Sequence, residues 1–277
     1  MIFITVARNL KMYEALVKNN KYNQGAEFVY YDNNQKNVAI TKRYNHFLDN
    51  YNYDKEDWFI FCHEDWQVKK AWFGYFKILD KDSVYGVCGT LLAVNNHNHV
   101  CTYFCGQIKQ CNKDGSNPSK FGNWVKIGTE VETFDCMCII MHSSLVKKHN
   151  IRFDENLDWH LYSEELSIRF KEDHGIKSRI LPVRCKHWSY GVSMPNADFD
   201  AAFNYVANKH RSAENLYATT VTNKYIGNNK AIQRGLPPKS FWSFLFRTRV
   251  SKSGRLHIKI FNITVFSINI QAKNEIK

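Results

Sequence analysis

Short apolar runs alternate with amphipathic stretches over the first 90 residues of the chain. Strands covered on both faces carry few polar residues, so buried strands are predicted at 2–6, 27–31, 58–62 and 84–88. The stretches between them predict helices at 9–18, with Asn9 as the N-cap, at 38–48 and at 69–79. This alternation predicts an α/β fold with a mostly parallel sheet and helices on both of its faces.

The later part of the chain has a less regular pattern. Strands are predicted in a hairpin at 100–110 and singly at 134–141 and 179–183. Helices are predicted at 143–149, at 163–174 with Ser163 as the N-cap, and at 198–217. Two alternating runs at 257–260 and 263–270 predict a small terminal hairpin. We therefore expect one domain over residues 1–220 and a separate extension over residues 221–277.

Composition narrows the class of protein. No run of about 18 apolar residues predicts a membrane-spanning helix, and the N-terminus lacks the basic and small-residue features of a secretory signal. We therefore expect a cytoplasmic protein, in which the eight cysteines remain free thiols. Cys101, Cys105 and Cys111 follow His97 and His99, but their spacing does not match a structural zinc site.

Positive charge is concentrated at the C-terminus. From residue 221 onward there are eleven Lys or Arg residues and one acidic residue, a net charge of +10. The chain as a whole carries +12, so the first 220 residues are close to neutral at +2. The extension is therefore predicted to be a basic segment that contacts an acidic partner.

Three clusters of polar residues follow predicted strands or open a predicted helix. His63, Glu64 and Asp65 end the buried strand at 58–62, where carboxylates could hold Mg²⁺ or Mn²⁺ against a diphosphate. The alternative for this cluster is a solvated turn, or the His-x-Asp pair of a mononuclear metallohydrolase.

The second cluster, Glu164 and Glu165, lies in the first turn of a helix. One of these carboxylates could act as a general base. Alternatively, both could do no more than interact favourably with the positive end of the helix dipole. Adjacent helical positions point about 100° apart, so only one of the two can face a site. The third cluster contains His187, which is either a packed histidine or a ligand for a borderline cation such as Mn²⁺.

The order of these clusters resembles that of GT-A glycosyltransferases, specifically bacterial glycosyltransferase family 2 and its relatives. The resemblance covers roughly residues 1–190. It rests on the ordered stretches 42–45, 61–65, 85–89, 134–138, 151–155 and 162–170, and on His187. It implies a GT-A, Rossmann-like domain, with a nucleotide-binding half at about 1–95 and an acceptor half at about 96–220.

The resemblance also implies a role for each matching residue. Glu165 stands at the position of the catalytic base, and Asp65 and His187 at those of metal ligands. The residues implied in binding the nucleotide-sugar donor are Arg8, Asp32, Lys42, Asn45, His63, Glu64 and Asp65. Those implied in the acceptor cleft are Asp135, Trp159 and Glu164. The sequence departs from the family in carrying His63 at the first acid of the DxD element, and Glu rather than the commoner Asp at the base.

These implications give a specific functional hypothesis. The chain is expected to transfer a sugar, by an inverting displacement with Mn²⁺ or Mg²⁺, from a nucleotide sugar to a bacterial surface glycan such as lipooligosaccharide, capsule or O-antigen. UDP-hexose is the favoured donor. The alternatives are a GT-A-like binding protein with altered catalytic motifs, and a nucleic-acid-binding protein that uses the basic tail; nucleic acid is not expected, because the tail matches no recognised module.

The tail also suggests a location. Aromatic and apolar residues at 241–246 are followed closely by Arg247, Arg249, Lys252 and Arg255. Apolar groups beside cations suit an anionic bilayer surface, where each Lys or Arg contributes on the order of 1 kcal/mol. The protein is therefore expected on the inner face of the cytoplasmic membrane, acting on a saccharide or lipid-linked saccharide. The alternative is that the tail packs on the body of the protein.

Overall fold

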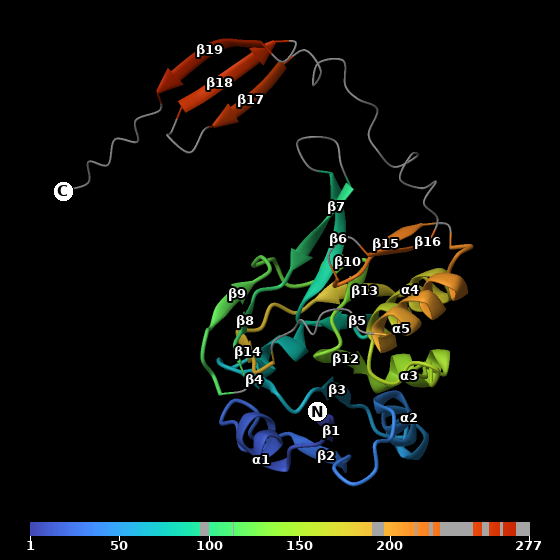
Figure 1. Cartoon of the computed structure of the whole chain (residues 1–277). Helices are drawn as coiled ribbons and strands as arrows, with labels where there is room; N and C mark the ends of the chain where they lie inside the picture. Colours follow the sequence, from blue (N-terminus) through green and yellow to red (C-terminus); the bar gives the residue numbers. More distant parts are fainter. Residues whose placement is uncertain are drawn as a thin grey trace, which may run out of the picture. The chain divides into compact units, whose positions relative to one another are not determined.

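The computed structural model describes residues 1–94, 100–112, 114–189, 197–213, 215–221 and 224–227, and the strands at 246–250, 255–260 and 263–269 (Figure 1). The chain divides into two compact units, residues 1–228 and 229–277. Each unit is described separately below.

A seven-stranded sheet forms the centre of the first unit (Figure 1). Its strands lie in the order β10 (Thr129–Val131), β13 (Lys177–Ile180), β5 (Ser83–Gly86), β12 (Cys138–His142), β3 (Trp58–Cys62), β1 (Ile2–Ala7) and β2 (Glu27–Asp32). Five of the strands run in one direction, and only β12 and β10 run against them. The predicted α/β fold with a mostly parallel sheet is confirmed.

Apolar side chains pack on both faces of this sheet. One core contains side chains from α2 (Ile40–Asn50), α3 (Ser143–His149), α4 (Tyr162–His174) and α5 (Ala197–Lys209). The other contains side chains from α1 (Leu10–Tyr13), the π-helical turn η1 (Glu14–Lys18), β4 (Trp66–Val68) and β14 (Cys185–His187). Asn9 caps α1 as predicted, because its side chain accepts a hydrogen bond from the amide of Met12. Helices therefore cover both faces, with small strands completing the second layer.

Smaller sheets surround the central one. One has the order β11 (Thr133–Phe134), β6 (Gly89–Val94) and β7 (Val100–Cys105). Another has the order β4, β14, β8 (Ile108–Gln110) and β9 (Ser119–Phe121), and a third pairs β15 (Leu216–Ala218) with β16 (Tyr225–Gly227). The predicted hairpin at 100–110 is wrong, because β7 pairs with β6 whereas β8 pairs with β14 and β9.

Three predicted helical features also differ from the structure. The helix predicted at 69–79 is only a short 3₁₀ turn, η2 (Phe73–Lys77), because its aromatic residues pack individually against the second core. The helix predicted at 198–217 ends at Lys209, and the chain then forms β15. Ser163 does not cap α4, which begins at Tyr162. The residue before it, Leu161, takes a left-handed conformation at φ 58°, which is uncommon outside glycine.

The second unit contains a three-stranded antiparallel sheet of β17 (Phe246–Val250), β18 (Arg255–Ile260) and β19 (Ile263–Asn269). The predicted terminal hairpin therefore exists as β18 and β19, with β17 added to it. The register pairs Phe246 with Ile260 and Val250 with Leu256, whereas Arg247 pairs with Lys259. Residues 241–245 of the predicted membrane-contacting segment, and Lys252, lie outside the described residues.

Within the described parts of the chain, no helix has the length and apolarity needed to cross a membrane.

Candidate metal centre and active site

Strand pairing brings three potential metal ligands together at the carboxyl end of β3. His63 and Asp65 lie in the turn between β3 and β4, and β4 pairs with β14 so that Trp66 stands opposite His187. The backbone amide of Trp188 donates to the carbonyl of Asp65 at 2.8 Å, which closes this pairing. His187 is therefore held beside Asp65 by backbone hydrogen bonds alone.

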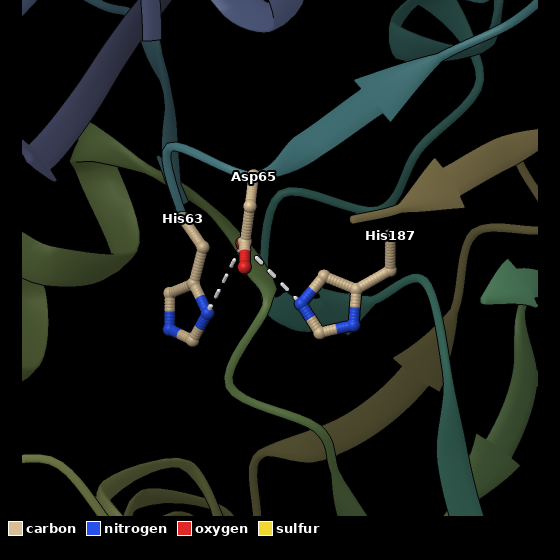
Figure 2. A group of neighbouring side chains, drawn as sticks. All are labelled: His63, Asp65 and His187. Carbon is tan, nitrogen blue, oxygen red and sulfur yellow. Dashed lines mark ion pairs between the residues drawn. The ribbon is translucent and has the colours of Figure 1, made fainter. Parts of the chain in front are cut away.

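The three side chains converge on one point (Figure 2). Asp65 Oδ1 lies 3.3 Å from Nε2 of His187 and 4.0 Å from Nδ1 of His63. One potential ligand atom from each residue lies within 4.8 Å of the others, a separation that a single cation could bridge. The predicted ligands Asp65 and His187 are thus brought together, and His63 joins them.

The cluster has unsatisfied polar atoms that a cation would suit. Asp65 Oδ1 and both ring nitrogens of His187 are buried and, apart from the contact between Oδ1 and Nε2, have no hydrogen-bond partner among the residues that the structure describes. Leaving such atoms without a partner costs free energy, which a bound cation would recover. Two imidazoles and one carboxylate form a mixed nitrogen and oxygen donor set, which suits Mn²⁺ better than Mg²⁺. The residues present therefore fit a divalent cation.

Burial and neighbouring charges shift the pKa values of all three side chains. Burial opposes ionisation of Asp65, but the neighbouring His187 and His63 outweigh it and lower the pKa of the carboxyl to about 2. Burial lowers the pKa of His63, so its imidazole is neutral near pH 7. For His187, the contact with Asp65 outweighs burial and raises the pKa. A bound cation would replace the proton that this contact favours.

The loop before β12 reaches the same point because β12 runs antiparallel to β3. Its register places Cys138 opposite Cys62, and the amide of His63 donates to the carbonyl of Met137 at 3.0 Å. Asp135 begins this loop, and its Oδ1 accepts from the amide of Met137 at 2.9 Å. The negative charge of Asp135 raises the pKa of both His63 and His187, as a smaller contribution than burial. Asp135 therefore lies near enough to His63 and His187 for its charge to act on both.

Glu164 and Glu165 have different surroundings although they are neighbours in α4. Glu164 is buried, its carboxylate accepts from Ser163 and Thr220, and burial raises its pKa with a further contribution from nearby Asp135. The negative charges of both Asp135 and Glu164 also act on Cys136. Glu164 is therefore the member of the acidic pair that lies near Asp135 and Cys136.

Glu165 is engaged in a buried ion-pair cluster instead. Its carboxylate accepts from Nε of Arg169 at 2.9 Å and from Nζ of Lys209 at 2.7 Å. Although burial opposes ionisation, His210, Arg169 and Lys209 outweigh it and lower the pKa of Glu165 to about 2. A carboxylate held by two cations is a weak proton acceptor. These contacts do not support the prediction that Glu165 is the catalytic base.

The residues predicted to bind the donor are spread along the carboxyl ends of β1, β2 and β3. Arg8 follows β1, and its guanidinium lies 4.6 Å from the ring centroid of Trp159, so the structure brings together a predicted donor residue and a predicted acceptor residue. Glu64 accepts from the amide of Asn9 at 2.8 Å, which ties the turn after β3 to the end of β1. Asp32, at the end of β2, accepts from the amide of Asn34 at 2.8 Å.

Lys42 and Asn45, both in α2, are placed differently. Lys42 is exposed. Asn45 is buried, and its amide group bonds to the backbone of Phe153 and to the carboxylate of Glu155. These bonds anchor the chain after α3 on α2, and they leave Asn45 engaged away from the metal ligands.

Solved structures similar to this chain are GT-A-type glycosyltransferases, as the sequence resemblance led us to expect. A crystal structure of GalNAc-T7 with UDP, GalNAc and Mn²⁺ has a TM-score of 0.48 and 10% identity, over 76% of this chain and 48% of that one. A crystal structure of Staphylococcus aureus TarS has a TM-score of 0.44 and 13% identity, over 77% of this chain and 40% of that one.

A second structure of TarS, spanning its residues 1–349, has a TM-score of 0.46 and 12% identity, over 77% of this chain and 66% of that one. This chain thus spans about half the length of the GalNAc-T7 chain (48%) and 40% of the first TarS chain. The likeness concerns the fold. The sequence matches no protein-family model and no curated protein.

Sequence reasoning missed one polar contact at the site. The hydroxyl of Tyr162 lies 2.9 Å from Nε2 of His63 and donates to the carbonyl of Cys136 at 3.2 Å. Tyr162 stands directly before the acidic pair, so the sequence placed it in the right motif without indicating a role. α4 begins at Tyr162 rather than at Ser163. The hydroxyl of Tyr162 then lies at His63, a contact that the sequence pattern does not indicate.

A surface hollow of about 550 Å³ lies apart from this centre. It is lined by residues that include Glu130, Lys171, Glu172 and Ser178. Lys171 and Glu172 belong to the last turns of α4, whereas Tyr162 begins the helix. The hollow is therefore at the far end of α4 from the metal ligands, and we assign it no part in the chemistry.

Proposed function

We propose that the chain is a metal-dependent glycosyltransferase that moves a sugar from a nucleotide-sugar donor to a saccharide acceptor. The observation that carries this proposal is the convergence of His63, Asp65 and His187 beyond the end of β3 (Figure 2). The buried carboxylate of Glu164 lies close enough to Asp135 for the charge of Asp135 to raise its pKa. Ligands of open α/β sheets bind beyond the carboxyl ends of the strands. A cation site and a proton acceptor at this edge are the two groups that such a transfer requires.

His63, Asp65 and His187 would hold the divalent cation, and we expect Mn²⁺ rather than Mg²⁺ because two of the three ligands are imidazoles. When bound, the cation would neutralise the negative charge on the departing nucleoside diphosphate. The chain's own residues would supply the rest of the donor site. Arg8, Asp32 and Glu64 stand at the ends of β1, β2 and β3, where they could contact the nucleotide.

Glu164 is our proposed proton acceptor, in place of Glu165. Its raised pKa makes it a stronger base than an ordinary glutamate, whereas Glu165 is held as an ion pair. In the proposed step, Glu164 takes the proton of an acceptor hydroxyl while that oxygen attacks the anomeric carbon of the donor sugar. The bond between the anomeric carbon and the diphosphate oxygen breaks at the same time. One displacement of this kind inverts the anomeric configuration.

The acceptor and the location are the broader part of the proposal. Trp159, in contact with Arg8, offers an aromatic face for a sugar. The charge of Asp135 acts on both His63 and Glu164. We propose a bacterial surface glycan as acceptor, a domain of residues 1–220 and a basic extension of 221–277. The extension would contact an anionic membrane on the cytoplasmic side through its basic and apolar residues.

The function is tested by release of nucleotide from a panel of UDP- and GDP-sugars, with Mn²⁺, in the presence and absence of saccharide acceptors. We expect release that depends on both Mn²⁺ and an acceptor, and that is lost in Asp65→Asn. Release without any acceptor would indicate a hydrolase instead. Full turnover in excess EDTA, or turnover in Asp65→Asn equal to that of the wild type, would contradict the metal-dependent mechanism.

A further inference from the structure

The hydroxyl of Tyr162 makes two polar contacts. It donates to the carbonyl of Cys136 at 3.2 Å, and it lies 2.9 Å from Nε2 of His63. A tyrosine hydroxyl has only one hydrogen to donate, and a carbonyl can only accept. The one arrangement in which both contacts are hydrogen bonds has the hydroxyl donating to Cys136 and the imidazole donating to the tyrosine oxygen.

This direction determines where the proton of His63 lies. A neutral imidazole carries one N–H, so a hydrogen on Nε2 leaves a lone pair on Nδ1. Nδ1 is the atom on the side of Asp65, 4.0 Å from its Oδ1 (Figure 2). That separation is too long for a hydrogen bond, so the geometry gives no sign of a proton on Nδ1 donated to Asp65. A lone pair on Nδ1 is what a metal ligand requires.

The hydroxyl is held firmly in this position. Tyr162 is completely buried, and its ring packs against the rings of Tyr44 and Phe153 at centroid distances of 6.2 and 6.1 Å. The carbonyl of Cys136 is fixed in turn, because the next carbonyl, that of Met137, accepts from the amide of His63 at 3.0 Å. The loop before β12 and the first residue of α4 therefore form a closed set of hydrogen bonds around His63.

We propose that Tyr162 is a positioning residue, which holds His63 with its proton on Nε2 so that Nδ1 faces the cation site. The inference rests on the metal centre of the proposed function, and it adds a residue that acts through His63 rather than on the substrate. It also explains how a histidine can replace the first acid of the metal-binding turn. A histidine ligand needs a partner for its second nitrogen, and α4 provides one.

The first test observes the wild-type protein. Nitrogen-15 NMR of histidine-labelled, metal-free wild-type protein at neutral pH distinguishes protonated from unprotonated ring nitrogens, and the His63 signals are assigned by their absence in His63→Ala. We expect His63 to be neutral with hydrogen on Nε2. A neutral ring with hydrogen on Nδ1 would overturn the inference, and this result does not depend on whether Tyr162→Phe folds.

The second test measures Mn²⁺ affinity by calorimetry. Tyr162→Phe keeps the ring and removes only the hydroxyl, so we expect Mn²⁺ to bind about 10–100-fold more weakly. The matched control is Tyr51→Phe, which removes a hydroxyl bonded to Asp57 before the start of β3, at the opposite end of that strand from His63. It should bind Mn²⁺ as the wild type does. Unchanged affinity in Tyr162→Phe would overturn the inference.

A double-mutant comparison separates positioning from general destabilisation. If Tyr162 acts through His63, Tyr162→Phe should cause no further loss of Mn²⁺ affinity in the His63→Ala background. An equal loss in both backgrounds would overturn the positioning role. Failure of the proposed function looks different. A wild-type protein that binds no Mn²⁺ removes the metal centre and the role of Tyr162 with it, whereas a wild type that binds Mn²⁺ with hydrogen on Nδ1 removes that role alone.

Discussion

Asp65 Oδ1 lies 3.3 Å from Nε2 of His187, although Asp65 lies in the turn before β4 and His187 ends β14. Among the described residues, neither atom has a hydrogen-bond partner beyond this contact. Burying a carboxylate and an imidazole in this way is costly unless a further group satisfies them. The pair is therefore better explained as half of a metal centre than as a structural ion pair. The predictions below test this explanation and its consequences.

Replacing Asp65 by Asn should abolish metal binding while leaving the fold intact, because the amide has nearly the same shape but no charge. The loss of Mn²⁺ affinity should exceed the roughly 10–100-fold that removal of an outer partner causes. Calorimetric titration measures it, with Asp82→Asn as a control because that carboxylate is exposed and pairs with Lys148. Equal affinities in the two variants would contradict the proposed centre.

Removal of the cation should lower the melting temperature of the wild-type protein. A ligand that binds only the native state stabilises it, by about 2.7 kcal/mol at 100 times its dissociation constant. Adding Mn²⁺ to protein treated with EDTA should therefore raise the melting temperature in a concentration-dependent way. The same addition should have no effect on Asp65→Asn, and a similar rise there would mean that the cation binds elsewhere.

Replacing Glu164 by Gln should reduce the rate of transfer by about 10²–10⁴-fold, the range that a general base contributes. Gln can accept from one of Ser163 and Thr220 and donate to the hydroxyl oxygen of the other, so the fold and the affinity for the donor should remain. Single-turnover transfer and calorimetric donor titration separate the two quantities. A variant that retains the wild-type rate would remove Glu164 from the proposed role.

Glu165→Gln should behave in a different way, by weakening stability. Gln removes the buried counterion of Arg169 and one of the two carboxylates that pair with Lys209, the other being Asp154. Breaking a buried pair costs on the order of 3 kcal/mol. Denaturant unfolding measures this loss. The rate of transfer by the folded variant should fall far less than in Glu164→Gln, and the opposite order would restore Glu165 as the base.

The same ion pairs should make stability depend on acid. The pKa values of Glu165 and Asp154 are both lowered to about 2, so their contribution is complete above the ordinary carboxyl range near 4 and is lost as the pH falls towards 2. The free energy of unfolding of the wild type should therefore fall over that window. Its slope should be smaller in Glu165→Gln, and equal slopes would show that Glu165 does not titrate with folding.

Much of the fold could be predicted from local pattern, because buried strands such as β3 are continuous apolar runs in the sequence. The errors arise where distant residues decide the structure. The apolar stretch at 69–79 has the composition of a helix, but Trp72 and Phe76 pack into a core built by other segments. Likewise, β7 and β8 are adjacent in sequence, yet each pairs with a strand from another part of the chain.

The sequence indicated which segments contribute to the candidate site, but not which way their side chains point. The resemblance assigned the base to Glu165, but in the structure Glu165 is held by Arg169 and Lys209, and we propose Glu164 instead. The choice between the two glutamates is not set by local pattern. That choice depends on where α4 starts, and Leu161 sets the start through a left-handed backbone conformation that no local signal indicates. Lys209, which engages Glu165, comes from α5, far away in the sequence.

The metal ligands are contributed by residues 63, 65 and 187, and the hydroxyl that orients His63 by residue 162. During synthesis on a ribosome, the nascent chain thus lacks a complete set of ligands until residue 187 has emerged and β14 has paired with β4. Cation capture would then follow assembly of the nucleotide-binding half rather than guide it. The cation would then stabilise a domain whose central sheet has already formed.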